Sequence, residues 1–200
     1  MEKIGVLALQ GDFREHRKVL EDIGGSTCLV RRPAELDKVD GLIIPGGEST
    51  TISKLLRKWN LFEPVQEKAR NGLPLFGTCA GLILMAKEVK NGPLSLDLMD
   101  ITVERNAYGR QIESFESRLE FLSDEEGEGR NGSINGVFIR APQVTRVGPN
   151  VEELARHEGL PVLLREDNLL GATFHPELSD DPSIHEYFLR EVVGKYSEVL

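Results

Sequence analysis

Short apolar runs alternate with amphipathic segments in the first half of the chain. After each run, apolar residues recur three or four positions apart, and this alternation predicts parallel strands connected by helices. Nearly every side chain in the runs is apolar, which is typical of strands that are buried on both faces of a parallel sheet. The predicted strands are residues 4–9, 27–30, 41–44 and the run that ends at Leu75 and Phe76.

Capping signals bound the helices predicted between these strands. Asp12, followed three residues later by Glu15, predicts a capping box at the start of the first helix, which should end at Gly24. Glycine and proline at the other boundaries are typical of helix ends and helix starts. The other predicted helices are a turn at 34–38, a helix capped by Ser49 or Thr50, a helix from Pro64 to Gly72, and one directly after Cys79.

The second half of the chain lacks this alternation. Its short apolar runs are separated by turn residues, which predicts antiparallel strands at 101–103, 116–121, 137–140, 144–147, 162–164 and 170–174. After Asp181 and Pro182 we expect a last helix whose apolar face packs back on the sheet. The fold class is therefore α/β, with a mixed, centrally parallel sheet flanked by helices. Because no linker or repeat divides the chain, residues 1–200 are expected to form one domain.

Composition narrows the range of partners. The 200 residues carry a formal net charge of −9, which argues against nucleic acid or an anionic membrane surface, because both need clustered Lys and Arg. No apolar run approaches membrane-spanning length, and the N-terminus lacks the pattern of a signal peptide. The segment 122–135 is acidic and glycine-rich, and we expect a solvated, mobile loop there without an assigned function.

The two cysteines, Cys28 and Cys79, have different surroundings. Neither belongs to a Cys-x-x-Cys pair, which fits a reducing cytoplasm, and Cys28 lies in an apolar run that we expect in the core. Cys79 lies in Gly-Thr-Cys-Ala-Gly between a strand and a helix, which predicts a nucleophile elbow with cysteine in place of serine. Gly77 and Gly81 let the backbone turn sharply, and the helix start favours a thiolate. A buried cysteine packed as a small apolar residue is the alternative.

A second chemical signal is Phe-His-Pro-Glu at 174–177, at the end of the last predicted strand. A cysteine nucleophile needs an imidazole that takes its proton and later delivers it to the leaving group, and His175 could do so. Glu177 could accept a hydrogen bond from that imidazole and fix its tautomer. A structural or exposed histidine is the alternative, and no metal site is expected. We interpret the remaining histidines as surface residues: His16, His157 and His185.

The third signal is Pro-Gly-Gly-Glu-Ser-Thr at 45–50, between a strand end and a helix start. The amide of Gly47 and, at the elbow, the amide of Ala80 could donate to a developing oxyanion. A phosphate loop is the rival interpretation, but the Walker pattern needs Gly-Lys-Ser/Thr and this loop has Gly-Glu-Ser. A tight turn that requires glycine is compatible with both roles.

Together these motifs resemble the class I, triad-type glutamine amidotransferases. Within that group, the segments 9–12, 46–51, 104–111 and 138–142 resemble the glutaminase subunits of pyridoxal 5′-phosphate synthase. The resemblance runs nearly end to end and implies the flavodoxin-like three-layer sandwich of that class. The segment 122–135 looks longer than is usual for the family, which affects local loop contacts only.

The resemblance implies a role for each site residue. Cys79 would attack the side-chain amide of L-glutamine to give a γ-glutamyl thioester, with His175 as acid and base and Glu177 as its orienting partner. Gln10 is expected to order the oxyanion loop, and no cofactor is implied. An arginine can grip a carboxylate bidentately and a glutamate can hold an ammonium, but which group meets which is open. The residues implied to contact glutamine are Gly46, Gly47, Glu48, Arg105, Ile139 and Arg140.

The resemblance also implies a partner chain. A glutaminase domain would use all 200 residues, so we expect the enzyme that accepts the ammonia to be a separate chain. In the family this partner is the synthase subunit, with which a hetero-oligomer is expected, and activity should be low until it docks. Two alternatives stay open. A related protease or deglycase-like enzyme typically has histidine after the elbow cysteine, where this chain has Ala80, and a non-catalytic subunit would usually have lost Cys79 or His175.

Overall fold

The computed structural model describes residues 2–105, 114–121 and 133–194 of the chain. Two sequence-based expectations fall partly outside these ranges, at residues 106–111 of the family-like segment and residues 122–132 of the acidic segment. Within the described ranges, none of the helices has the length and apolar character needed to cross a membrane.

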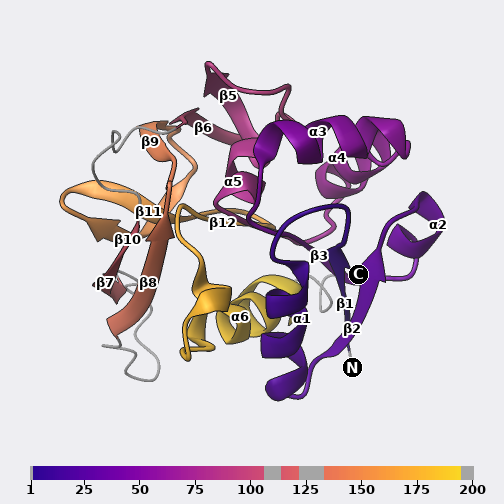
Figure 1. The fold of residues 1–200 in the computed structure, drawn as a ribbon, viewed down its shortest axis with the longest axis horizontal. Coiled ribbons are helices and arrows are strands. Elements are labelled where there is room, and N and C mark those ends of the chain that lie inside the picture. The colour runs from indigo at the N-terminus through magenta and orange to yellow at the C-terminus, as the bar shows by residue number, and fades with distance from the viewer. Residues whose placement is uncertain (1, 106–113, 122–132, 195–200) are drawn as a thin grey trace.

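A nine-stranded sheet forms the centre of the molecule, with strand order β2-β1-β3-β4-β12-β11-β10-β7-β8 (Figure 1). The first five strands in this order pair in parallel, and the remaining pairs are antiparallel. The sequence-based expectation of a mixed sheet is therefore confirmed. The bounds are β1 Lys3–Leu7, β2 Ser26–Val30, β3 Gly41–Ile44, β4 Leu75–Thr78, β7 Ser114–Phe121, β8 Ser133–Ile139, β10 Glu152–His157, β11 Leu160–Glu166 and β12 Leu169–Ala172.

Helices cover both faces of the parallel part of this sheet, with α3, α4 and α5 on one face and α1 and α6 on the other (Figure 1). Because successive strand side chains point to opposite faces, Leu42 and Ile44 pack with α3–α5, whereas Ile43 packs with α1 and α6. Cys28 is half-buried and packs against the apolar core between the sheet and α3–α5. The bounds are α1 Phe13–Asp22, α2 Pro33–Leu36, α3 Ser49–Lys58, α4 Phe62–Arg70, α5 Ala80–Met85, η1 Pro176–Leu178, α6 Ser183–Tyr187 and η2 Phe188–Gly194.

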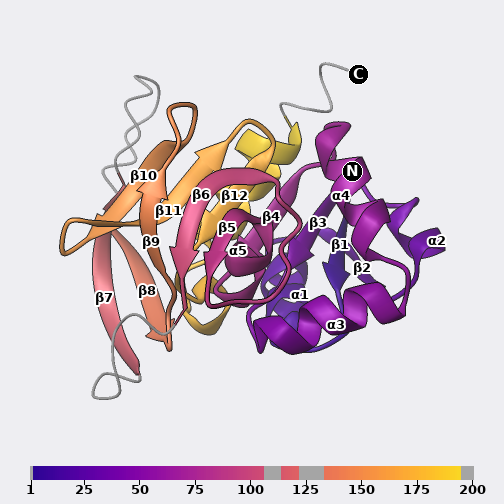
Figure 2. The ribbon, with the colours of Figure 1, turned by 90° about the horizontal axis from the view of Figure 1, so that it is seen from above.

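A second sheet of three strands lies on the α3–α5 side of the molecule (Figure 2). Its strands are β5 Ala86–Lys90, β6 Met99–Glu104 and β9 Gln143–Val147. β5 pairs in parallel with β6, and β6 pairs antiparallel with β9. Ile101 and Val144 bring this sheet into the same core as α5.

Two sequence-based predictions about strands differ from the structure, and two strands were missed. One sheet was expected, but residues 101–103 and 144–147 belong to the second sheet. Residues 170–174 were expected to form an antiparallel strand, yet β12 pairs in parallel with β4 and antiparallel only with β11. The strands β5 and β10 were not predicted. An apolar run indicates burial, but it carries no information about the direction of the neighbouring strand.

Two helix caps also differ from the prediction. Asp12 precedes α1 but its side chain makes no capping hydrogen bond, so the predicted capping box is absent. The carboxylate of Asp12 faces His175 instead. The helix α3 is capped by Glu48, whose carboxylate accepts hydrogen bonds from the amides two and three residues later, and not by Ser49 or Thr50.

Candidate active site

The loops that carry the predicted chemistry follow four adjacent parallel strands. Gln10 comes after β1, Gly46 after β3, Cys79 after β4 and His175 after β12. These strands are neighbours in the order β1-β3-β4-β12. Because the carboxyl ends of parallel strands meet at one edge of a sheet, the four loops come together at that edge.

Cys79 lies at the turn between β4 and α5 in a strained backbone conformation, with φ 47° and ψ −100°. A Cβ on Gly77 would lie 2.7 Å from the carbonyl carbon of Gly81, and a Cβ on Gly81 would lie 2.0 Å from the carbonyl oxygen of Ile44. Both positions therefore require glycine, because the chains approach too closely for any side chain. This sharp strand–turn–helix geometry is that of a nucleophile elbow.

The imidazole of His175 bonds Glu177 and lines the same cavity as Cys79. Its Nδ1 lies 2.8 Å from Oε1 of Glu177, and both residues are buried. Burial by itself lowers the pKa of His175, but hydrogen bonds with Cys79 and Glu177 raise it to about 10. Burial raises the pKa of Glu177, and the hydrogen bond from His175 opposes this effect. The imidazole therefore carries a proton at neutral pH that it could deliver to a leaving group.

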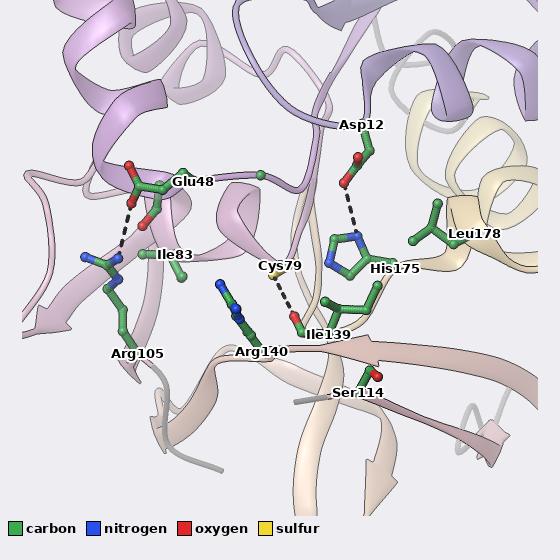
Figure 3. A pocket seen from close by; sticks show the side chains of 12 residues that line it. Asp12, Glu48, Cys79, Ile83, Arg105, Ser114, Ile139, Arg140, His175 and Leu178 are labelled. Atoms are coloured by element: carbon green, nitrogen blue, oxygen red, sulfur yellow. Dashed lines mark hydrogen bonds and ion pairs between the residues drawn. The ribbon is translucent and has the colours of Figure 1, made fainter. Parts of the chain in front are cut away.

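Asp12 is a second carboxylate beside His175, and the sequence did not assign it to the site. Its Oδ2 lies 3.6 Å from Nδ1 of His175 at the edge of the pocket (Figure 3). Asp12, His175 and Glu177 offer ligand atoms within 4.8 Å of one another, a grouping suited to a metal ion. Since Nδ1 of His175 already bonds Glu177, a metal ion would have to displace that hydrogen bond. Sequence spacing could not reveal this cluster because Asp12 lies far from His175 along the chain.

The glycine turn after β3 packs against His175 and against the segment after β1. A Cβ on Gly46 would lie 2.3 Å from Cε1 of His175, so only glycine allows this approach. Oε1 of Gln10 accepts a hydrogen bond of 2.9 Å from the amide of Glu48, directly after Gly47. Ala80 is the first residue of α5, where backbone amides lack an acceptor within the helix.

Glu48 and Arg105, both expected to contact glutamine, bind each other. Arg105 donates from Nη2 to Oε1 of Glu48 at 3.2 Å and from Nη1 to Oγ1 of Thr50 at 3.1 Å. The Glu48 oxygens also accept from the amides of Thr50 and Thr51 at 3.0 and 2.7 Å. Burial raises the pKa of Glu48, but the hydrogen bonds outweigh it and lower the pKa to about 2. The carboxylate is therefore charged and already bonded by the backbone of α3 and by Arg105.

A cavity of about 650 Å³ joins these groups (Figure 3). The carbonyl oxygen of Ile139, at the end of β8, lies 3.9 Å from Sγ of Cys79 and closes the side opposite the elbow. Arg140 follows with a positive φ of 45° and also lines the cavity. The lining residues are Asp12, Gly47, Glu48, Ser49, Cys79, Ile83, Arg105, Ser114, Ile139, Arg140, His175 and Leu178. Four of the predicted site residues are not in this lining: Gln10, Gly46, Ala80 and Glu177.

The structure contradicts the interpretation of the other histidines as surface residues. His16 and His185 are fully buried, and Nδ1 of His16 lies 2.9 Å from Nε2 of His185. His157 is half-buried and stacks on Phe115. One sequence signal could have located His16, because its position, three residues after Phe13, falls within the apolar stripe of α1.

Comparisons with known proteins cover nearly the whole chain. The model of the SNO glutamine amidotransferase family matches residues 6–194. A protein of Thermosipho africanus named pyridoxal 5′-phosphate synthase subunit PdxT is 54% identical over 191 residues, which cover 95% of this chain and 98% of that protein. A protein of the same name from Thermotoga maritima is 51% identical and covers 95% of this chain and 99% of its own length.

Solved structures agree with these relatives. A crystal structure of a glutamine amidotransferase superposes with a TM-score of 0.86 at 47% identity, covering 96% of this chain and 98% of that chain. The structure of PurLQS from Thermotoga maritima superposes with a TM-score of 0.73 at 14% identity, covering 96% and 99%, which shows a shared fold alone. The fold and the family resemblance expected from the sequence are both confirmed. The chain belongs to the SNO glutamine amidotransferase family.

Proposed function

We propose that this chain hydrolyses L-glutamine to L-glutamate and ammonia through Cys79, His175 and Glu177. The observation that carries the proposal is the buried imidazole of His175, whose Nδ1 lies 2.8 Å from Oε1 of Glu177 and which lines the same cavity as Cys79. The cavity beside them has a volume of about 650 Å³ and is large enough for an amino acid. Membership of a glutamine amidotransferase family identifies the substrate amide as that of glutamine.

In the first half of the reaction the Cys79 thiolate attacks Cδ of the glutamine side chain and forms a C–S bond. The carbonyl oxygen becomes an oxyanion, to which the amides of Gly47 and Ala80 would donate. The imidazolium of His175 then protonates the leaving nitrogen, the C–N bond breaks, and ammonia departs. The products of this half are a γ-glutamyl thioester on Cys79 and a neutral His175.

In the second half water replaces the thiol. Neutral His175 takes a proton from the water, whose oxygen attacks the thioester carbonyl, and the C–S bond breaks. Glutamate leaves, and Cys79 and His175 return to their starting state. Glu177 stays charged throughout and keeps the Nδ1–H of His175 directed toward itself, so that Nε2 faces the reacting atoms.

The remaining wall residues would bind the amino-acid end of glutamine. Arg105 and Arg140 bring positive charge to the cavity, which suits the α-carboxylate. Gly46, Gly47 and Ile139 would contact the substrate through backbone groups. Glu48 would act on glutamine through Arg105, because its own oxygens are already bonded to α3 and to that guanidinium.

Replacement of Cys79 by Ala tests the proposal. The variant should release no glutamate from glutamine, whereas the wild-type chain, assayed with a synthase subunit, should release one glutamate for each ammonia. Cys28→Ala is the matched control, because Cys28 lies on β2 and outside the cavity lining, and it should keep its activity. Glutamate release by the Cys79→Ala variant at the wild-type rate would refute the assignment of the nucleophile.

We also propose that the ammonia serves a separate synthase subunit in the formation of pyridoxal 5′-phosphate. The relatives at 54 and 51% identity are named as subunits of that synthase, and they match this chain over almost their whole length. Residues 1–200 would then form one glutaminase domain that joins the synthase subunit in a hetero-oligomer. A catalytic thiol needs reducing conditions, which suits a cytoplasmic complex.

A further inference from the structure

A buried polar network lies directly behind the triad, and the mechanism above does not use it. His16 on α1, Thr78 at the end of β4 and His185 on α6 are all completely buried. Nδ1 of His16 lies 2.9 Å from Nε2 of His185, and Nε2 of His16 lies 3.0 Å from Oγ1 of Thr78. Buried polar groups of this kind are costly unless their hydrogen bonds are satisfied, so their arrangement constrains the elements that carry them.

The partners of the two imidazoles identify where the protons lie. Burial lowers the pKa of both His16 and His185, the latter to about 4, so each ring is neutral and carries one proton. Nδ1 of His185 has no hydrogen-bond partner within the described part of the chain. A buried N–H without an acceptor is rarer than a bare acceptor, so we assign the proton of His185 to Nε2, which donates to Nδ1 of His16. The proton of His16 must then be on its Nε2.

That N–H group faces two parts of the active site. It lies 3.0 Å from Oγ1 of Thr78, which also accepts a hydrogen bond of 3.0 Å from the amide of Gly46 in the glycine turn. It also lies 3.4 Å from Oε2 of Glu177, the carboxylate oxygen that does not bond His175. Among the described residues, this Oε2 has no hydrogen bond of ordinary geometry, and the His16 N–H faces it from α1.

We propose that His16 is a positioning residue, oriented by His185, whose Nε2–H holds the triad carboxylate of Glu177 and, through Thr78, the glycine turn at Gly46 in one arrangement. The proposal deepens the glutaminase function and rests on it. Its physical basis is that Glu177 on η1 and Thr78 at the end of β4 both lie close to the Nε2–H group of His16 on α1. Thr78 in turn bonds the turn after β3. If that group is lost, Glu177 is free to turn away from His175, and the imidazole loses its orientation toward Cys79.

Other titratable groups lie near this network and also affect the active site when the pH is varied. His175 and Asp12 face Glu177 from the cavity side, and His185 faces His16 from α6. The experiment therefore measures the reactivity of Cys79 itself across pH, because the thiol responds to the orientation and charge of His175 whether or not glutamine is turned over.

The rate of alkylation of Cys79 by iodoacetamide, followed by mass spectrometry of the Cys79 peptide between pH 5 and 10, provides this measurement in the full chain. Thr78→Val keeps the shape of the side chain but removes the shared hydroxyl, and His16→Leu removes the N–H. Each should slow alkylation at pH 7 by roughly two- to tenfold, as expected for loss of a hydrogen bond between neutral groups. Thr78→Ser and His16→Gln restore a polar group at the same place and should recover most of the rate.

Thr102→Val is the matched control, because Thr102 is a buried threonine whose hydroxyl bonds Glu88 on the second sheet, away from the cavity. It should lower the melting temperature without changing the pH profile of Cys79. If Thr78→Val and His16→Leu lower the melting temperature but alkylate like the wild type, the network is structural only and the proposal is wrong. Normal alkylation in a wild-type chain that releases no glutamate with its synthase subunit would instead refute the glutaminase function and leave the positioning role standing.

Discussion

The charge of His175 shows how a single residue depends on its neighbours. Its pKa, raised from 6.5 to about 10, means that the folded protein holds a proton that the unfolded chain releases above pH 6.5. The stabilisation from the charged imidazole is therefore complete below pH 6.5 and is lost as the pH rises through 10. This window brackets neutral pH, where the proposed reaction needs the proton for its leaving group.

An NMR titration of labelled His175 tests this charge state. In the wild type the imidazole should remain protonated at pH 8. In Glu177→Gln the pKa should fall, because one of the two hydrogen bonds to the charged form loses its negative partner. An imidazole of the wild-type protein that titrates near its ordinary value of 6.5 would contradict the ion-pair arrangement.

Thr173 offers a second prediction for a single residue. It is 1% exposed, and its Oγ1 lacks a hydrogen-bond partner among the residues that the structure describes. Thr173→Val removes this buried hydroxyl and should stabilise the protein by about 1 kcal/mol. Thr78→Val is the contrasting control, because it deletes a hydroxyl with two partners and should destabilise. Urea denaturation of both variants gives the comparison, and a destabilised Thr173→Val would mean that the hydroxyl has a partner.

At the scale of elements, one helix can serve both packing and chemistry. The apolar stripe of α1 packs on the sheet through Leu20, and the same helix carries His16 within that face. Asp12, directly before α1, does not cap the helix as expected, and its carboxylate faces His175. The start of α1 is therefore less well capped than its sequence predicts, while two of its polar side chains lie against the triad.

The helix α3 shows the opposite arrangement, in which a candidate substrate contact serves as the cap. Glu48→Ala should destabilise the protein by about 1–2 kcal/mol, the usual cost of losing an N-cap. It should also raise the KM for glutamine, because Arg105 loses the carboxylate that positions it. Calorimetry and steady-state kinetics of this variant give the two quantities.

The pH dependence of this cap has the opposite sign to that of His175. The pKa of Glu48 is lowered from 4.5 to about 2, so its stabilisation is complete above pH 4.5 and is lost as the pH falls toward 2. The wild type and Glu48→Ala should therefore approach equal stability in acid. A stability difference that persists unchanged at pH 2 would show that the helix is capped by another group.

At the scale of the whole molecule, both halves of the chain build the site. The parallel half supplies the loops after β1, β3, β4 and β12. The opposite wall comes from Ile139 at the end of β8 and Arg105 directly after β6 of the second sheet. This wall is formed by segments that lie far from Cys79 in sequence. A partner that contacts the wall could therefore change the geometry at the thiol without touching the elbow.

Dependence on a partner is the prediction at this scale. Glutamate release should be slow for the chain alone and should rise on addition of a synthase subunit, because free ammonia released into water would be protonated and diluted. The Cys79→Ala variant should still bind the synthase subunit, since the elbow is only slightly exposed. Equal rates with and without the synthase subunit would refute the coupling.

Local patterns in the sequence determined several features of this protein. The apolar runs located β1, β3 and β4, because burial on both faces leaves few polar positions. The glycines on either side of Cys79 indicated a sharp turn, although the close approach of Gly81 to Ile44 on β3 could be seen only in the structure. The pairing of His175 with Glu177 was likewise readable, since two residues separated by one proline are near each other in any fold.

Only the tertiary structure decided which distant groups meet. The parallel pairing of β12 with β4, the second sheet, the contact of Asp12 with His175 and the burial of His16 against His185 all join segments far apart in the chain. The pair of Glu48 and Arg105 belongs to the same class. The physical reason is that periodicity and capping signals report interactions between residues close in sequence, whereas these contacts depend on how whole elements pack. The sequence also does not show whether a histidine or carboxylate is exposed or buried.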